Sequence, residues 1–298
     1  MSKKQIGDTV QALFNSFIRE RELYQKAPST VINYKATFKA LCKRMPGVES
    51  KPIGAIDKRF IVNYLESLTS ASLAVATINH NIRDLKVFIY WCMENDYIVP
   101  FKIKCLKDNT PMKTPYTREE VCVLLRKPLP TDDFATWRSW AIVNLVLGCG
   151  VRAMTITNMK IQDIDHANNL IFLRHNKDGK PTTLPLVPQL KKALVAYERH
   201  HIGDTDVLFP ARGGTMLSIN GLREGIMLFN KDRGVNQTSV HLLRHTFGTM
   251  WAENGGDVYE LQRFMTHKDI RTTQNYINLY GRGHDASRAI LFNPLENL

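Results

Sequence analysis

Four side chains able to act on a phosphate group lie within about forty residues near the C-terminal end of the chain: His241, Arg244, His267 and Tyr276. His241 and Arg244 are three residues apart in a stretch with helical spacing, so their side chains share one face. Arginine is a planar, permanently charged fork that suits phosphate, and a neighbouring histidine can donate to the same oxygens or move a proton. No carboxylate pair, thiol cluster or glycine-rich phosphate loop accompanies them. The set therefore predicts a tyrosine nucleophile assisted by cations, without a metal ion.

Other interpretations of this stretch are weaker. His241 and His245 are four residues apart, as two zinc ligands on one helix can be. The glutamate of an H-E-x-x-H motif and a nearby third ligand are missing, so no metal is expected and His245 is interpreted as a buried hydrogen-bonding residue. Tyr259 lies on an apolar helix face and is expected in the core. Tyr280, one helical turn after Tyr276, remains the alternative nucleophile.

The stretch from Ser239 to Tyr280 resembles the second signature box of the tyrosine recombinases, the phage integrase family. It contains H-L-L-R-H-T-F-G-T and then T-H-K-D-I-R-T-T-Q-N-Y. The family pattern is approximately H-x-L-R-H-T-F-A-T followed by L-G-H-x-x-x-x-T-T-x-x-Y. The nine-residue spacing from His267 selects Tyr276 as the nucleophile. Thr266 stands where the family usually has glycine, a residue that permits a tight backbone path.

A second stretch is similar to the first signature box of the same family. It reads C-G-V-R-A-M-T-I-T-N-M-K-I-Q-D-I-D, against T-G-L-R-x-x-E-L-x-x-L-x-x-x-D-I-D, and it places Arg152 directly after a glycine turn. Thr155 replaces the glutamate that helps to hold this arginine in the family. The resemblance also implies a catalytic lysine on a hairpin, eight residues before the proline of the next strand. Lys177 has that spacing to Pro185, and Lys180 is the alternative.

The resemblance implies a reaction as well as a site. The expected catalytic residues are Arg152, Lys177, His241, Arg244, His267 and Tyr276. The tyrosine would attack a DNA phosphodiester and leave a 3′-phosphotyrosyl link beside a free 5′-hydroxyl. The arginines and histidines would stabilise charge on the non-bridging oxygens, and Lys177 would protonate the departing 5′-oxygen. Because the link conserves the bond energy, no cofactor is expected.

Composition and charge favour a polyanionic partner. The 298 residues carry a formal net charge of +12, which indicates binding to nucleic acid or to an anionic membrane surface. A membrane role is the weaker interpretation, since the chain has no spanning apolar run, no signal peptide and no helix with an apolar face and a basic rim. We therefore expect a cytoplasmic protein, associated with the nucleoid if bacterial. The odd number of widely spaced cysteines predicts reduced thiols.

The apolar pattern predicts a mainly α-helical fold with a small antiparallel β-sheet, divided into two domains. Residues 1–98 contain four short amphipathic helices, expected at 5–24, from Pro28, at 52–68 and from Thr77. They resemble the SAM-like core-binding domain of the recombinases, which binds DNA. The residues expected to contact DNA are Lys35, Lys39, Lys43, Arg83 and Lys86.

The second half of the chain is expected to hold the chemistry. Residues 99–116 are rich in proline and lysine and are expected to be an interdomain linker. Residues 117–298 would form the catalytic domain, which starts with a capping box between Thr117 and Glu120. Alternating apolar and polar residues in 161–187 predict the small sheet. In the family an amphipathic tail, here about 281–298, contacts a neighbouring protomer.

Site-specific DNA recombination is therefore the expected function. Departures of the second signature box from its usual form favour integration and excision of a mobile element. Three alternatives stay open: Xer-like resolution of dimers, relaxation by an enzyme like a type IB topoisomerase, and DNA binding without catalysis. The resemblance implies double-stranded DNA with inverted-repeat core sites as the partner, a dimer on each site and a tetramer in the synapse. An accessory DNA-bending or directionality factor would act with it.

Overall fold

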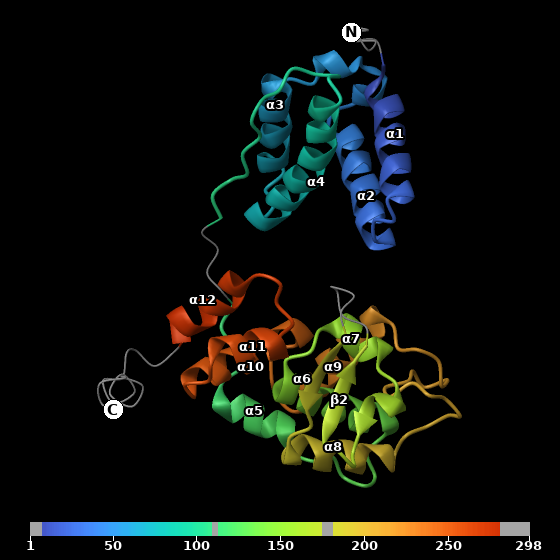
Figure 1. The fold of residues 1–298 in the computed structure, drawn as a ribbon, viewed down its shortest axis with the longest axis vertical. Helices are drawn as coiled ribbons and strands as arrows, with labels where there is room; N and C mark the ends of the chain where they lie inside the picture. Colours follow the sequence, from blue (N-terminus) through green and yellow to red (C-terminus); the bar gives the residue numbers. More distant parts are fainter. Residues whose placement is uncertain (1–7, 109–112, 175–180, 281–298) are drawn as a thin grey trace, which may run out of the picture. The chain divides into compact units, whose positions relative to one another are not determined.

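The computed structural model describes residues 8–108, 113–174 and 181–280. The chain divides into two compact units, Met1–Met112 and Lys113–Leu298, which are described separately (Figure 1). The division falls inside the stretch expected to be a linker. Lys177, Lys180 and the expected tail at 281–298 lie outside the described residues.

The described part of the first unit is a group of four α-helices (Figure 1). They pack around an aromatic core. The helices are α1 (Val10–Leu23), α2 (Pro28–Arg44), α3 (Lys58–Thr69) and α4 (Val75–Glu94), with the short 3-10 turns η1 (Val48–Ser50) and η2 (Ile53–Ala55) between α2 and α3. The ring of Phe14 stacks on Phe38 with centroids 3.9 Å apart, and Phe88 meets Phe14 edge-on at 5.3 Å. Burial of these rings joins α1, α2 and α4.

The second unit combines helices with one small sheet. Its elements are α5 (Arg118–Leu125), α6 (Phe134–Cys149), α7 (Ala153–Asn158), η3 (Ile161–Asp163), β1 (Ile164–Asp165), β2 (Leu170–Leu173), β3 (Thr182–Pro185), α8 (Pro188–Glu198), α9 (Ile219–Asp232), α10 (Val240–Glu253), α11 (Val258–Phe264) and α12 (Ile270–Tyr280). The strands form an antiparallel sheet in the order β1-β2-β3, with Ile171 opposite Leu184. The predicted fold class is confirmed.

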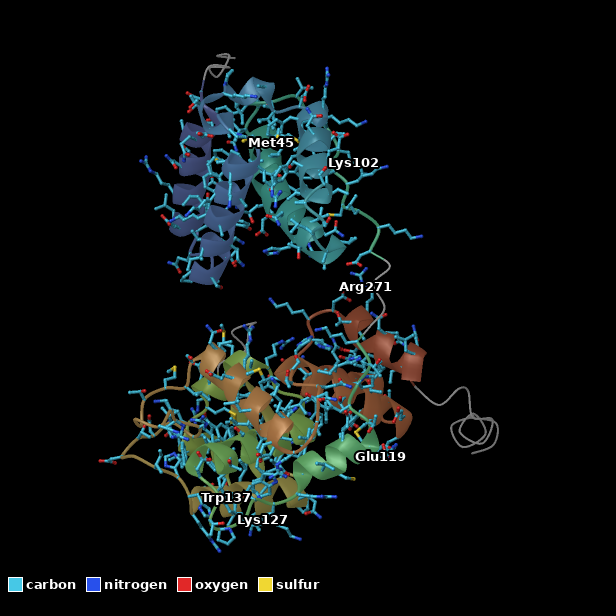
Figure 2. The ribbon with its side chains drawn as sticks, turned by 180° about the vertical axis from the view of Figure 1, so that it is seen from behind. Met45, Lys102, Glu119, Lys127, Trp137 and Arg271 are labelled. Atoms are coloured by element: carbon cyan, nitrogen blue, oxygen red, sulfur yellow. The ribbon has the colours of Figure 1, made fainter. Side chains whose placement is uncertain are left out.

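Helix α6 is the centre of the second unit and contacts α5, α8, α9 and α10. It is apolar on nearly every side, as expected of a helix surrounded by other elements. Trp137, labelled in Figure 2, is 2% exposed. The helix ends at Cys149, and its C-cap Gly150 has a φ of +61°. A Cβ added to Gly150 would lie 2.5 Å from the Phe247 ring of α10. Glycine therefore permits both the turn and the close approach of α10, and Arg152 follows directly as the N-cap of α7.

Some described residues of the expected linker pack on one unit or the other, although most of them are exposed. The backbone of Leu106 exchanges two hydrogen bonds with the side chain of Asn79 in α4, at 2.8 and 2.9 Å. On the other side of the division, the amide of Tyr116 donates to Thr246 Oγ1 of α10 at 2.9 Å. The predicted capping box of Thr117 and Glu120 then opens α5. The second unit thus begins attached to the helix that carries His241 and Arg244.

No helix in the described part of the chain is long and apolar enough to cross a lipid bilayer.

Candidate active site

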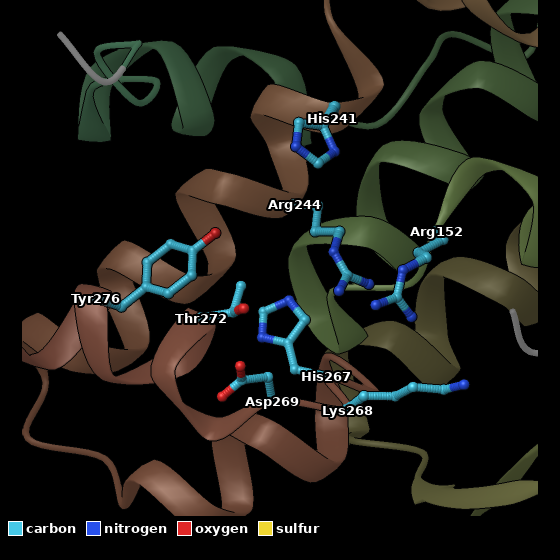
Figure 3. A pocket seen from close by; sticks show the side chains of 8 residues that line it. All are labelled: Arg152, His241, Arg244, His267, Lys268, Asp269, Thr272 and Tyr276. Atoms are coloured by element: carbon cyan, nitrogen blue, oxygen red, sulfur yellow. The ribbon is translucent and has the colours of Figure 1, made fainter. Parts of the chain in front are cut away.

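A pocket of about 440 Å³ on the second unit brings together five of the six expected catalytic residues (Figure 3). Its lining consists of Arg152, His241, Arg244, His267, Lys268, Asp269, Thr272 and Tyr276. These side chains come from the turn after α6, from α10 and from the segment between α11 and the middle of α12. The sixth, Lys177, lies outside the described residues.

Helix α10 supplies one arginine and one histidine to the pocket. Ser239 caps the helix by accepting a hydrogen bond from the amide of Leu242. Arg244, one turn after His241, is only 3% exposed, and its guanidinium donates to the carbonyl oxygens of Gly150 and Met265. These backbone acceptors fix the plane of the guanidinium without neutralising its charge.

Positive charge is concentrated in this pocket. Burial, and then the neighbouring charge of Arg152, lower the pKa of Arg244 to about 9. The lining also contains Lys268 and one carboxylate, Asp269, which is bound to Arg271. The positive charges of the two guanidinium groups repel each other in this poorly solvated site, and an anion bound between them would stabilise both. The pocket is therefore suited to a phosphate group.

Arg152 reaches the pocket from the N-cap of α7. Its guanidinium donates to the carbonyl oxygen of Thr266 at 2.9 Å and also to the hydroxyl of the same residue. Figure 3 shows Arg152 and Arg244 next to each other, with His267 beside them. The two arginines, one on α10 and one at the N-cap of α7, thus lie side by side in the pocket.

Both histidines have pKa values below the ordinary value. For His267 the pKa falls to about 4, first because of burial and then because of the charges of Arg244 and Arg152. Burial and Arg244 also lower the pKa of His241. His267 Nδ1 lies 2.9 Å from the hydroxyl of Thr273, which is fully buried. With this hydroxyl as donor, the neutral ring carries its proton on Nε2 and can donate it to a phosphate oxygen.

Tyr276 lies on α12 with its ring against α10. The residue is 9% exposed and its ring belongs to a small core with Phe247, Leu261 and Met265. In Figure 3 its hydroxyl is directed toward the side of the pocket that holds His241 and Arg244. The structure thus places Tyr276 in the same pocket as the cationic side chains.

The remaining residues weighed in this stretch take other places. His245 is 7% exposed and its ring centroid lies 5.2 Å from that of Tyr276, so its predicted burial is confirmed. The prediction that Tyr259 is a core residue is wrong, because its side chain is 68% exposed. Helix α11 is only seven residues long, and it turns Leu261 inward while Tyr259 faces outward. Tyr280 ends α12.

The tyrosine ring occupies space that only glycine leaves open on α10. A Cβ added to Gly248 would lie 2.8 Å from Tyr276 Cε1 and 3.0 Å from Cδ1 and Cζ. We predict that Gly248→Ala displaces the ring and slows DNA cleavage about tenfold, since small misplacements of a nucleophile are costly. Helix propensity favours alanine over glycine by about 0.5–1 kcal/mol, so the fold should not be weakened in proportion. Single-turnover cleavage and thermal unfolding measure the two effects.

Gly225→Ala in α9 is the matched control for this substitution. A Cβ there would make only ordinary contacts, the nearest at 3.4 Å from Ser139 Oγ. Cleavage should stay at the wild-type rate in this control. An unchanged rate in Gly248→Ala would show that the ring position is not set by this glycine.

Sequence reasoning did not single out Thr273 or Gly248. A signal for Thr273 was present, because it is the second threonine of the T-T pair and stands three residues before the tyrosine. Its role as the partner of His267 needs the three-dimensional structure, since the bond crosses from a turn into the first turn of α12. The contact of Gly248 with Tyr276 joins two helices and has no local sequence pattern.

The five basic residues expected to contact DNA lie on two helices of the first unit. Lys35, Lys39 and Lys43 are exposed on α2, and Lys35 forms an ion pair with Glu22 at 3.0 Å. On α4, Arg83 is exposed and Lys86 lies over the ring of Tyr90, 4.9 Å from its centroid. A shallow hollow lined by Ala40, Lys43, Arg44 and Ser67 lies at the end of α2.

Most of the second unit matches a known protein family in sequence. Residues 117–282 match the Phage integrase family. The tyrosine recombinase XerC of Proteus mirabilis is 23% identical over 283 residues, covering 92% of this chain and 91% of the relative. The tyrosine recombinase XerA of Pyrococcus furiosus is 27% identical over 243 residues, covering 80% and 82%.

Solved structures of similar fold include integrases bound to DNA. The Tn1549 transposon integrase in complex with a circular intermediate DNA matches with a TM-score of 0.75 at 21% identity, covering 97% of this chain and 99% of the other. A lambda integrase dimer bound to a COC′ core site matches with a TM-score of 0.73 at 16% identity, covering 93% and 98%. A lambda integrase tetramer bound to a Holliday junction gives 0.73, also at 16% identity, covering 94% and 80%. Because these sequence identities are low, the similarity to the solved structures shows that the folds are alike.

Proposed function

This chain belongs to the phage integrase family of tyrosine recombinases, and we propose that it recombines DNA at specific sites through a covalent bond between Tyr276 and the DNA backbone. The observation that supports this most directly is the pocket that one phenol shares with the buried guanidinium of Arg244 and the partly buried guanidinium of Arg152. An anion bound there would lie within reach of a nucleophile. A phosphodiester of DNA supplies both the anion and the electrophile.

The proposed chemistry assigns one role to each side chain. The Tyr276 oxygen attacks phosphorus, the bond from phosphorus to the 5′-oxygen breaks, and a 3′-phosphotyrosyl link forms. Arg152 and Arg244 stabilise the charge on the non-bridging oxygens, and His267 and His241 donate hydrogen bonds to the same group. The reverse attack, by a 5′-hydroxyl of another strand, releases Tyr276 and rejoins the DNA.

Proton transfer completes the assignment. A phenol has an ordinary pKa of about 10 and needs help to lose its proton at neutral pH. We assign acceptance of that proton to His241, because burial lowers its pKa and its neutral ring has one nitrogen without a proton. We assign protonation of the departing 5′-oxygen to Lys177, which stands eight residues before Pro185.

We further propose that the first unit is a DNA-binding domain and that the chain assembles on DNA. The exposed basic residues of α2 and α4 and the net charge of +12 support DNA contact. The lambda integrase dimer on a core site and tetramer on a Holliday junction support a dimer on each inverted-repeat site and a tetramer in the synapse. A cytoplasmic location follows from a DNA substrate.

For the biological role, we propose integration and excision of a mobile element. The fold shared with the Tn1549 transposon integrase and lambda integrase supports this role. Resolution of DNA dimers is the second candidate, because curated relatives are XerC and XerA. Deletion of the gene distinguishes them: loss of excision of the surrounding DNA segment supports the first role, and accumulation of plasmid or chromosome dimers supports the second.

The proposed chemistry is tested with a nicked DNA duplex. The duplex carries the sequence that the purified chain selects from a random DNA pool, with a nick near the crossover so that the short 5′-hydroxyl fragment is lost after cleavage. We expect covalent protein–DNA complexes that resist denaturation and form equally well in EDTA, since the pocket stabilises charge with arginines. Tight binding without any covalent complex would contradict the proposal and favour a DNA-binding protein without catalysis.

A further inference from the structure

The turn between α11 and α12 contains an unusual backbone conformation. Thr266 has a φ of +45°, in the left-handed region. Its amide donates to the carbonyl of Arg263, and the amide of His267 donates to that of Gln262, both at 3.1 Å. This is the hydrogen-bond pattern of a Schellman helix end, in which the left-handed position is usually glycine.

A threonine is costly at this position. The left-handed region is disfavoured by about 1–2 kcal/mol for residues with a Cβ, and β-branched side chains are rare there. Glycine would satisfy the same turn without this cost. A strained residue that glycine could replace points to a function for its side chain.

The side chain of Thr266 faces an arginine of the active site. Arg152 donates to its hydroxyl with Nη1 and to its carbonyl with Nη2, at 2.9 Å for the latter. One residue therefore provides a two-point acceptor for one guanidinium, which fixes both its position and its plane. Glycine at this position would retain the carbonyl and lose the hydroxyl.

Neighbouring residues of the turn hold the rest of the site. The carbonyl of Met265 accepts from Arg244, and the imidazole of His267 lines the pocket. Met265 is fully buried, which anchors the turn in the small core under Tyr276. Of three consecutive residues, Met265 thus contacts Arg244, Thr266 contacts Arg152, and His267 itself belongs to the site.

The sequence next to Arg152 gives a reason for the hydroxyl of Thr266. Thr155, which stands where the family has a glutamate that helps to hold the arginine, is a neutral side chain and only 4% exposed. Thr266 contacts the guanidinium that, by resemblance to the family, the glutamate at the position of Thr155 would help to hold.

We propose that Thr266 is a positioning residue that holds Arg152 in its phosphate-binding orientation through its hydroxyl, and that it does so at the expense of backbone stability. The inference rests on the proposed function, since it assumes that Arg152 binds the scissile phosphate. It assigns a role in the reaction to the residue that occupies the glycine position of the family signature.

Three substitutions in the full chain separate the hydroxyl from the strain. Thr266→Gly removes both, Thr266→Val removes the hydroxyl and keeps the branched side chain, and Thr266→Ser keeps the hydroxyl. We expect Gly and Val to slow single-turnover cleavage of the nicked duplex about 10- to 100-fold, the effect of losing a hydrogen bond to a charged group. Ser should stay within about threefold of the wild type.

The Thr266 variants should rank differently in thermal stability and in cleavage rate. Both variants lose the hydroxyl, but only Thr266→Gly relieves the backbone strain, so its Tm should exceed that of Thr266→Val by about 2–4 °C. Cleavage that is equally slow in the Gly and Val variants, although the two differ in stability, is the result that a purely structural role would not produce. Cleavage by Thr266→Gly at or above the wild-type rate would overturn the proposal.

A double-mutant cycle with Arg152 tests the route of the effect. In an Arg152→Ala background, Thr266→Val should cause no further loss of cleavage, because the residue acts through that arginine. An equal loss in both backgrounds would contradict the proposal. If the wild type itself forms no covalent complex, the proposed function fails; if only the order of the Thr266 variants differs from that expected, this inference alone fails.

Discussion

Tyr276→Phe is expected to bind DNA normally and to form no covalent complex with it. The ring would still fill the space against Gly248 and contact Phe247 and Met265, because the substitution removes only one oxygen atom. The nucleophile is that oxygen, so cleavage should fall below detection. Electrophoresis of the nicked duplex under denaturing conditions measures the covalent complex, and a gel-shift titration measures affinity.

Two other tyrosines serve as controls for this result. Tyr259→Phe changes an exposed side chain on α11 and should leave cleavage unaltered. Tyr280→Phe tests the alternative nucleophile at the end of α12. Covalent capture by Tyr276→Phe, together with loss of capture in Tyr280→Phe, would move the nucleophile by one helical turn.

Arg244→Ala is expected to slow cleavage by about a thousandfold or more while DNA binding is retained. The loss follows from the position of its guanidinium in the pocket, where it would stabilise charge that grows in the transition state. It should also weaken the fold by about 1–3 kcal/mol, because the carbonyl groups of Gly150 and Met265 lose their donor. Single-turnover cleavage, affinity and thermal unfolding are measured on the same preparation.

Arg244→Lys separates the two effects. Lysine keeps the positive charge but cannot donate to both carbonyl groups and to a phosphate in one plane. We expect cleavage that is faster than in Arg244→Ala and still well below the wild type. If Arg244→Ala lost DNA affinity and cleavage in equal proportion, the residue would be a binding residue and its assignment to the transition state would be contradicted.

Much of the fold could be predicted from local patterns. The helical spacing of Ile78, Ile82 and Leu85 predicted α4, and the capping box at Thr117 predicted the start of α5. Alternation in 161–187 predicted the antiparallel sheet. These features depend on residues close together in the sequence, which is why they could be predicted without the structure.

The approach of distant segments could not be predicted in this way. The outward direction of Tyr259 depends on which face of the seven-residue helix α11 meets α12, and the apolar pattern did not determine that face. The contacts of Thr266 with Arg152 and of Gly248 with Tyr276 join segments that are separated in the chain or lie on different helices. The signature boxes indicated which residues meet, and the structure indicates what holds them there.

The most direct measurement of the central claim is the position of the covalent bond. Wild-type protein trapped on the nicked duplex is digested with protease and nuclease, and the peptide that carries the nucleotide is sequenced by mass spectrometry. We predict a single modified residue, Tyr276, joined to a 3′-phosphate with a free 5′-hydroxyl on the other product. A nucleotide attached to another residue, or a 5′-phosphate link at Tyr276, would contradict the mechanism.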